Sequence, residues 1–436
     1  MDPPLKPKHT SVVKKYPSTR DSFVNGYWRW IEGKQKDDKA DGMWRVHDKL
    51  YNLHGFAEKH PGGQYWIDIT KGTDITEAFE SHHIGPKARE LLKDYCVGDA
   101  PDPRNYFFTY DENGFYQTLK RRVADKLKTV DHSVTKKSRF IHDVTLFMTL
   151  FAAVMMERNL GNQMMMVFWA LVSAHCLAWL TNISLNFVHQ ADNWRMYSAS
   201  LSLITFREFR VFHVLSHHMY PNTYADYEVS TYEPYWKWIP LKEKSWFYKS
   251  IAILIHPIIY VSFFHNIFQG YIWGKEKVFY WDELLLLILP LAMLFFGKQP
   301  ITWQLVLDIY GRWGYIVLPA EYLYSMFHFN RGHHGNGLIH QGDEITSFDF
   351  GEFQLSATLE RKEANYNTFT VLAYSGEQVL HHLFPTLDCA ILPQLKGTLA
   401  KTCKEFDIKL RPEITMLYAT WGSIRQLYRS EIIRST

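Results

Sequence analysis

Apolar residues are distributed unevenly along the 436-residue chain. The first 130 residues are rich in charged and polar positions, whereas long apolar stretches begin near residue 140. A helix needs about 20 mainly apolar residues to cross a bilayer. Five stretches are candidates for such spans: Phe140–Met156, Met164–Val188, Ser250–Trp273, Leu284–Phe296 and Thr302–Phe327. The pattern predicts a soluble N-terminal region followed by an all-α membrane domain.

The soluble region divides further by composition. Residues 1–40 carry prolines and lysines and form a partly flexible N-terminal lead-in. Residues 41–100 have the mixed pattern of a compact α+β unit, and residues 101–138 are a polar linker that contains "APDPR". Residues 139–436 then form the membrane domain. We therefore expect two folded domains joined by a linker.

The number of spans follows from the positions of the histidines. Histidine clusters lie after the second candidate span, before the third and after the fifth. If the clusters build one site, they face one side of the membrane, and an even number of spans separates them. We expect Ser250–Trp273 not to cross, because His256 and Pro257 interrupt its helix; the short Leu284–Phe296 is the alternative. The sequence thus predicts four spans.

Charge and cysteine usage indicate the compartment. Lys136, Lys137 and Arg139 precede the first span and place that end in the cytosol, so both termini and all histidine clusters are expected there. The 48 basic and 45 acidic residues nearly balance, which excludes a bulk nucleic-acid footprint. None of the 4 cysteines forms a CxxC pair, which argues against a disulfide framework and a zinc ribbon. The segment Met1–Thr10 has no apolar core and is not a signal peptide.

A pair of histidine motifs marks the N-terminal unit. "HPGG" begins at His60, and "DITEAFESHHIG", with His82 and His83, follows about twenty residues later. Histidines on two loops can bind a haem iron from opposite faces and give a centre that carries electrons. The stretch "WRVHDKLYNLHGFAEKHPGG…DITEAFESHHIGPKARELLKDYCVGDA" resembles the cytochrome b5 haem-binding domain over nearly its whole length. The resemblance implies haem b with His60 as one axial ligand and His83, which fits the family spacing better than His82, as the other.

Three acidic residues of this unit have two possible roles. Asp74, Glu77 and Glu80 either present a negative face to a reductase or are simply solvated.

Four further histidine clusters stand beside apolar segments. They are His189 and Asn193 in "FVHQADN"; His213, His217 and His218 in "FHVLSHHMYPN"; Asn330, His333, His334 and His340 in "FNRGHHGNGLIHQGDE"; and Gln378, His381 and His382 in "GEQVLHHLFP". Residues three or four apart share one helical face, so a helix can offer two imidazoles to one metal. Imidazole suits iron, copper, nickel and zinc. Several such helix ends that converge at a membrane surface can hold two irons.

A haem domain before three histidine boxes, the last of which reads "QVLHH", resembles the cytochrome b5-fused fatty-acid desaturases from about residue 41 to about residue 410. The resemblance implies a multi-pass protein of the endoplasmic reticulum with two non-haem irons. Such a protein uses O2 and electrons from its haem to insert a double bond into a fatty-acyl lipid. The implied iron ligands are His189, His213, His217, His218, His333, His334, His381, His382, Asn193 and Asn330. An NADH-linked cytochrome b5 reductase is the expected electron source, because the chain has no GxGxxG nucleotide motif.

Three departures from the family pattern keep other functions open. Asn193 stands where the first box usually has its second histidine, and Gln378 stands where many relatives have histidine. The second cluster also has one residue more than the commoner HxxHH. An amide binds iron more weakly than an imidazole does. The alternatives to desaturation are therefore fatty-acyl hydroxylation at the same site and a non-catalytic haem-bearing membrane protein with a decayed iron site.

Overall fold

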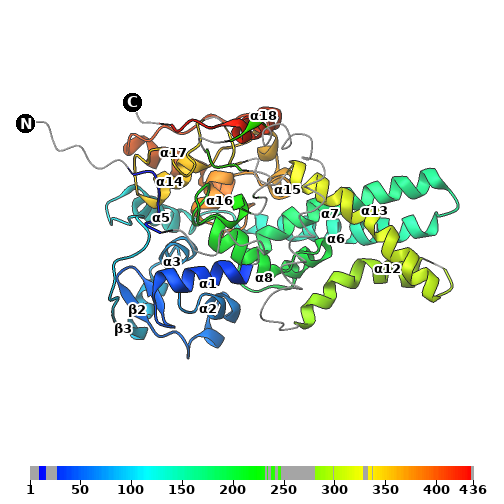
Figure 1. The fold of residues 1–436 in the computed structure, drawn as a ribbon, viewed down its shortest axis with the longest axis horizontal. Coiled ribbons are helices and arrows are strands. Elements are labelled where there is room, and N and C mark those ends of the chain that lie inside the picture. The colour runs from blue at the N-terminus through cyan, green and yellow to red at the C-terminus, as the bar shows by residue number, and fades with distance from the viewer. Residues whose placement is uncertain are drawn as a thin grey trace, which may run out of the picture.

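The computed structural model describes residues 9–15, 27–230, 233, 237–240, 244–246, 280–297, 299–327, 332–335 and 337–433. The candidate span Ser250–Trp273 and the candidate ligand Asn330 lie outside the described residues. Figure 1 shows a compact N-terminal unit at the lower left, C-terminal elements above it, and a bundle of long helices that projects to the right.

The N-terminal unit is a small α+β fold. Its antiparallel sheet has the order β1-β2-β3, and its core contains Trp44, Val46, Leu53, Ile67 and Phe79. The elements are β1 (Trp44–Val46), β2 (Lys49–Tyr51), the 3-10 turns η1 (Ala57–Lys59) and η2 (Lys93–Tyr95), the helices α2 (Gln64–Ile69), α3 (Thr76–His82) and α4 (Lys87–Leu92), and β3 (Cys96–Asp99). The α+β prediction for this unit is confirmed.

Two flanking helices join this unit to the rest of the chain. In α1 (Tyr27–Asp38) the indole nitrogen of Trp30 donates to the carbonyl of Ala225 at 2.9 Å. In α5 (Phe115–Lys126) the fully buried hydroxyl of Tyr116 donates to the carbonyl of Leu383 at 3.0 Å. Parts of the expected lead-in and linker are therefore ordered helices that bind the two domains together.

The projecting bundle contains the long apolar helices. Asn162 caps the start of α7, where its side chain accepts from the backbone of Met165. The bundle consists of α6 (Thr135–Arg158), preceded by the turn η3 (His132–Val134), α7 (Gln163–Val188), η6 (Trp281–Leu287), α12 (Ile288–Phe296) and α13 (Trp303–Phe327). Within the described residues, two helices, His132–Arg158 and Gln163–Val188, are long and apolar enough to cross a membrane. The four-span count is not confirmed; α13 packs on α7, but it carries charged residues.

One of these charges is neutralised inside the bundle. The guanidinium of Arg312 donates twice to the carboxylate of Glu157 on α6, at 2.8 and 2.9 Å. Asp308, one helical turn away, lies 4.0 Å from the same guanidinium. This bidentate pair ties α13 to α6.

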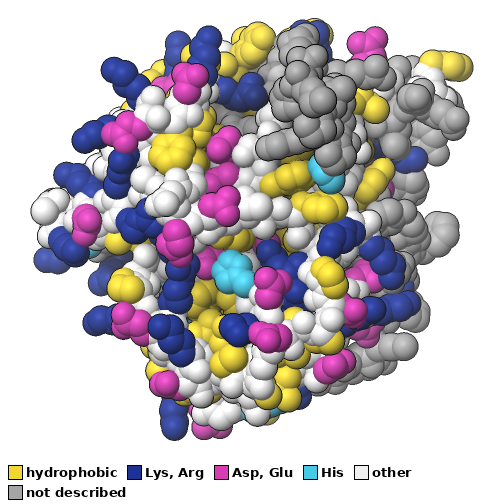
Figure 2. Space-filling view, turned by 90° about the vertical axis from the view of Figure 1, so that its left-hand side faces the viewer, with side chains coloured by type: hydrophobic (Ala, Val, Ile, Leu, Met, Phe, Trp, Pro, Cys, Tyr) yellow, Lys and Arg dark blue, Asp and Glu magenta, His cyan; other side chains and the backbone are white. Residues whose placement is uncertain are grey.

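Short elements close the end of the bundle that faces the N-terminal unit. They are η4 (Trp194–Ser202), α8 (Phe206–Phe209), the π-helix η5 (Arg210–His217), α9 (Tyr227–Ser230), α14 (Phe350–Ala357), η7 (Lys362–Asn365), α15 (Thr368–Ala373), α16 (Gln378–Leu383), η8 (Leu392–Leu395), α17 (Lys396–Glu405) and α18 (Met416–Tyr428). Figure 2 shows that the face remote from the bundle carries interspersed basic and acidic side chains. The apolar helices and the charged end thus lie on opposite sides of the molecule.

Candidate metal centre and haem cavity

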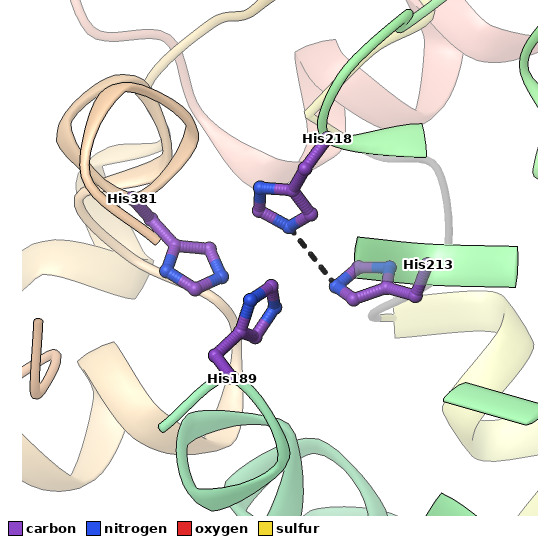
Figure 3. A group of neighbouring side chains, drawn as sticks. All are labelled: His189, His213, His218 and His381. Atoms are coloured by element: carbon purple, nitrogen blue, oxygen red, sulfur yellow. Dashed lines mark hydrogen bonds between the residues drawn. The ribbon is translucent and has the colours of Figure 1, made fainter. Parts of the chain in front are cut away.

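A first group of histidines gathers at the end of α7. One ring nitrogen from each of His189, His213, His218 and His381 lies within 4.8 Å of the others (Figure 3). His189 follows the last residue of α7, His213 and His218 come from η5 and its end, and His381 comes from α16. Imidazole nitrogens lie about 2 Å from a shared metal, so opposite ligands are about 4 Å apart. The observed spacing is close to that of a metal site.

A second group lies directly beside the first. It consists of His217, His333 and His382, whose ring nitrogens also lie within 4.8 Å of one another. The rings of His218 and His382, one from each group, stack with their centres 4.1 Å apart. The arrangement therefore provides two adjacent metal positions.

The π-helix explains how the longer second box still converges. In "HVLSHH", His213 and His218 are five residues apart, and in an α-helix they would point to different faces. Here the backbone amide of His218 donates to the carbonyl of His213 at 2.9 Å, the i→i+5 bond of a π-turn. The two Nε2 atoms consequently meet at 3.1 Å. The extra residue is absorbed by the turn.

Neighbouring acceptors fix the orientation of several imidazoles. Nδ1 of His213 lies 2.5 Å from Glu228, and Nδ1 of His217 lies 2.9 Å from Asp226. Nδ1 of His382 lies 3.1 Å from the amide oxygen of Gln354. When Nδ1 donates to an acceptor, Nε2 carries the free lone pair that a metal needs. The acidic residues Asp226 and Glu228 were missed at the sequence level, although "YADYE" begins only six residues after His218.

The burial of the remaining nitrogens fits a metal. Both ring nitrogens of His189, Nδ1 of His218 and Nε2 of His382 are buried and have no hydrogen-bond partner. Burial, followed by repulsion from neighbouring imidazoles, lowers the pKa of these three rings well below the usual range. Buried polar atoms without partners are costly, and neutral imidazoles are the form that binds metals. The donor set therefore fits a pair of imidazole-bound metal ions.

His217 is the exception among these imidazoles. Burial alone would lower its pKa, but the carboxylates of Glu228 and Asp226 outweigh burial and raise the pKa of His217 to about 9. These carboxylates also favour a bound cation.

The structure places two expected ligands, one amide and one histidine, away from both groups. The side chain of Asn193 caps η4 and donates to the carbonyls of Phe187 and Ala191 at 2.9 Å, so the expectation of Asn193 as a ligand is not met. His334 stacks on Trp238 with ring centres 3.9 Å apart, and its Nδ1 lies 3.0 Å from His340. Tertiary packing, which the linear spacing does not reveal, separates His334 from His333.

Gln378 remains close to the second group. Its amide nitrogen lies 3.0 Å from Nε2 of His333, and its amide oxygen is buried without a partner. Gln378 therefore contacts one member of the second group.

The N-terminal unit holds two histidines across a cavity of about 480 Å³. The rings of His60 and His83 lie 6.2 Å apart, close to the separation of about 6 Å expected for two imidazoles on one iron. Nδ1 of His60 lies 2.9 Å from the carbonyl of Gly63, and Nδ1 of His83 lies 3.0 Å from that of Phe79, which leaves both Nε2 atoms for a metal. The walls are largely apolar and aromatic, as a haem requires, and include Leu53, Phe56, Ile67, Ile75, Phe79 and Leu92.

The same cavity reaches the first histidine group. His82, His189, Gln190 and Ala191 also line it. Burial, followed by repulsion from His83, lowers the pKa of His82 to about 3, and its Nε2 is buried without a partner. The haem cavity and the candidate metal centre therefore share a wall.

The three acidic residues of the haem domain are neither solvated nor free for a reductase. Asp74 is 2% exposed, and Glu77 and Glu80 are 0% exposed. Arg104 forms ion pairs with Asp74 and Glu77 at 2.7 and 2.5 Å, and Lys120 pairs with Glu80 at 2.7 Å. Both expectations for this face are thus wrong, because residues beyond the haem domain cover it.

Fold and site together define a haem-binding domain fused to a helical, histidine-rich membrane domain. The cytochrome b5-like heme/steroid binding domain family matches residues 29–101, and the fatty acid desaturase family matches residues 133–413. The chain belongs to the fatty acid desaturase family and carries a cytochrome b5-like domain. The chain is therefore a member of a family of membrane-bound oxidoreductases of lipid metabolism. The predicted resemblance is confirmed.

Similar proteins match this chain along most of their length. The chain is 36% identical to a cytochrome b5-related protein of Drosophila melanogaster over 430 residues, which are 97% of this chain and 96% of that one. A delta(5) fatty acid desaturase A of Dictyostelium discoideum is 24% identical, with 92% and 93% of the two chains covered. An acyl-lipid (8-3)-desaturase of Mortierella alpina is 22% identical, with 87% and 91% covered. No solved structure matches the chain.

Proposed function

We propose that the protein carries out O2-dependent desaturation of a fatty-acyl lipid at a di-iron centre, with electrons supplied by a haem b in its own N-terminal domain. The observation that carries the proposal is the shared wall between the haem cavity and two adjacent groups of buried histidines. Desaturase relatives along nearly the whole chain support the same chemistry.

The proposed ligands follow from the two groups. His189, His213, His218 and His381 would hold one iron, and His217, His333 and His382 the other. Gln378 is the candidate for the missing fourth ligand of the second iron. His60 and His83 would hold the haem. The two non-haem irons, when bound by the two histidine groups, would reduce O2 and supply the oxidant that removes hydrogen from an unactivated methylene.

The chain itself orients and insulates these ligands. Asp226 and Glu228 hold the imidazoles of His217 and His213 in one tautomer. Six of the seven histidines are buried, and His213 is partly exposed, which keeps most bulk water from the centre. A low-dielectric surrounding of this kind strengthens every charge interaction within it.

The proposed setting is a four-span protein of the endoplasmic reticulum, with both termini and the two redox sites in the cytosol. The basic segment from Lys136 to Arg139 at the start of α6 supports this orientation. An NADH-linked cytochrome b5 reductase would reduce the haem. Protease accessibility of a tag at Thr436 in sealed microsomes tests the topology, and protection of the tag would contradict it.

Two alternatives use the same residues differently. Hydroxylation differs from desaturation only in the fate of the substrate radical and needs the same centre. A non-catalytic haem protein with a decayed centre is the other alternative, because the similar Drosophila protein is named only as cytochrome b5-related. The sequence supports this second alternative through Asn193, which replaces a histidine. The two histidine groups nevertheless bring seven imidazoles together without Asn193.

The deciding experiment is iron analysis of the purified full-length protein at constant haem content. Two irons beyond the haem are expected, and His217→Ala and His382→Ala are each expected to lower that number, because each removes a ligand from the second group. His132→Ala, an exposed histidine outside both groups, is the matched control. An iron-free wild type, or unchanged iron in both variants, would leave the haem-only alternative. Product analysis with a labelled acyl lipid then separates a double bond from a hydroxyl group.

A further inference from the structure

Arg210 occupies the boundary between the haem domain and the first histidine group. It begins η5, three residues before His213, and its side chain is completely buried. Its guanidinium lies 4.2 Å from the ring centre of Trp66 on α2, a residue that lines the haem cavity. In Figure 1, α2 and α8, the helix that leads into η5, lie side by side; Tyr65 and Phe206 join them, with ring centres 5.6 Å apart.

The same guanidinium holds the loop that carries His189. Nε donates to the carbonyl of Val188 at 3.2 Å, and one terminal nitrogen donates to the carbonyl of Gln190 at 3.3 Å. The other terminal nitrogen forms an ion pair with Asp192 at 2.7 Å. A planar guanidinium can meet several acceptors and an aromatic face at once, which a lysine ammonium cannot do. Arg210 thereby fixes the backbone on both sides of His189.

That loop also contacts the loop of the haem ligand His60. The backbone amide of Asp192 donates to the carbonyl of Gly62 at 3.1 Å. Gly63 has a φ of +112°, and a Cβ there would lie 2.2 Å from the Asp192 carboxylate. Glycine at position 63 therefore allows both the turn after His60 and the close approach of the two loops.

We infer that Arg210, Trp66 and Asp192 form a clamp that holds the haem domain in one fixed position for electron transfer from the haem to the iron at His189. The inference rests on the proposed function. The clamp makes Arg210 a positioning residue, since it contacts the loop that bears His189 and meets the haem domain at Trp66 on α2. Electron transfer slows steeply as two redox centres separate, so a loosened clamp slows transfer while each centre keeps its own ligands.

Hydrogen exchange tests the clamp without iron. In the haem-loaded, iron-free full-length protein, the amide of Asp192 is expected to be protected in the wild type and to lose protection in Arg210→Met. Arg207→Met is the matched control, because Arg207, one turn earlier, also meets the haem domain at the ring of Tyr65 but forms its ion pair with Asp282 instead of Asp192. Arg210→Lys, which keeps the buried charge, is expected to restore part of the protection. Unchanged protection in Arg210→Met would overturn the clamp.

Stopped-flow absorbance tests the electron transfer. Haem and iron contents are first matched, the haem is reduced anaerobically, and its reoxidation is followed after mixing with O2 and an acyl lipid. We expect reoxidation at least tenfold slower in Arg210→Met, an intermediate rate in Arg210→Lys, and a rate within twofold of wild type in Arg207→Met. If Arg210→Met loses protection of the Asp192 amide but reoxidises its haem at the wild-type rate, the role of the clamp in electron transfer is overturned. If Arg210→Met does not fold, the same two measurements on Arg210→Lys decide.

The proposed function has its own readout in this experiment. Iron-free wild-type protein is expected to reoxidise its haem more slowly than the iron-loaded form. Equal rates in the two forms would overturn the proposed function, whereas the exchange data would still decide the existence of the clamp.

Discussion

Glu228→Gln is expected to weaken metal binding without changing the haem. One carboxylate oxygen of Glu228 lies 2.5 Å from Nδ1 of His213, and the other lies 3.6 Å from Nδ1 of His217. The carboxylate therefore supports an imidazole in each of the two histidine groups. Glutamine keeps the size of the side chain and one acceptor oxygen but removes the charge.

The magnitude follows from this geometry. Removing an outer partner of a metal-bound histidine lowers metal affinity by about 10–100-fold, which is about 1.4–2.7 kcal/mol at about 1.36 kcal/mol per factor of ten. A charge-assisted hydrogen bond is roughly twice as strong as a neutral one. Because Glu228 is buried and reaches two imidazoles, we expect a loss toward the upper end of this range.

The assay is a competition titration of Co²⁺ or Fe²⁺ against a chelator, with full-length protein at constant haem content. Asp282→Asn is the control, since Asp282 pairs with Arg207 outside both histidine groups. The absorption of bound Co²⁺ also reports its ligand field, which a purely structural defect elsewhere would leave unchanged. An affinity within twofold of wild type would refute the role given to Glu228.

Two further predictions concern the haem domain. His83→Ala is expected to abolish the low-spin haem spectrum of the purified protein, whereas His82→Ala is expected to keep it, because the ring of His83 faces His60 at 6.2 Å; the reverse result would transfer the ligand role to His82. Burial alone would raise the pKa of Glu80, but contacts with His47 and Lys120 outweigh burial and lower it. A carboxyl group whose folded pKa is lowered stabilises the fold above its unfolded pKa, about 4.3, and this stability is lost as the pH falls below that value. Glu80→Gln is therefore expected to flatten the loss of thermal stability in acid, measured by haem absorbance, and an unchanged acid profile would contradict the prediction.

Local spacing together with the family resemblance predicted the haem domain and most members of the two histidine groups. His60 and His83 lie on loops whose positions follow from the short elements around them. His217 and His218 are neighbours in sequence, as are His381 and His382, so that each pair supplies both histidine groups once its helix is placed. Helical geometry and the chemistry of imidazole predicted this clustering, whereas the haem, its two ligands and the iron were predicted from the family resemblance.

Contacts between distant segments could not be predicted in this way. Lys120 covers Glu80 across 40 residues, and Trp66 meets Arg210 across the domain boundary. Neither contact has a periodic signature, because each depends on how two folded units dock. His333 and His334 are adjacent, yet one joins the second histidine group and the other stacks on Trp238. An irregular backbone turns adjacent side chains apart, and spacing rules hold only within regular helices.

The departures in the first and second boxes have a joint physical explanation. In an α-helix, His213 would share a face with His217 and point away from His218. The π-turn brings His213 to His218 and His189, so the first group contains four imidazoles although Asn193 contributes none. Restoring a histidine at position 193 would therefore not add a ligand, since that side chain caps η4 away from the centre. Removing one residue between His213 and His217 would instead place His213 and His218 four apart, on one face of an ordinary α-helix. The π-turn therefore compensates for the extra residue, and the first group does not depend on Asn193.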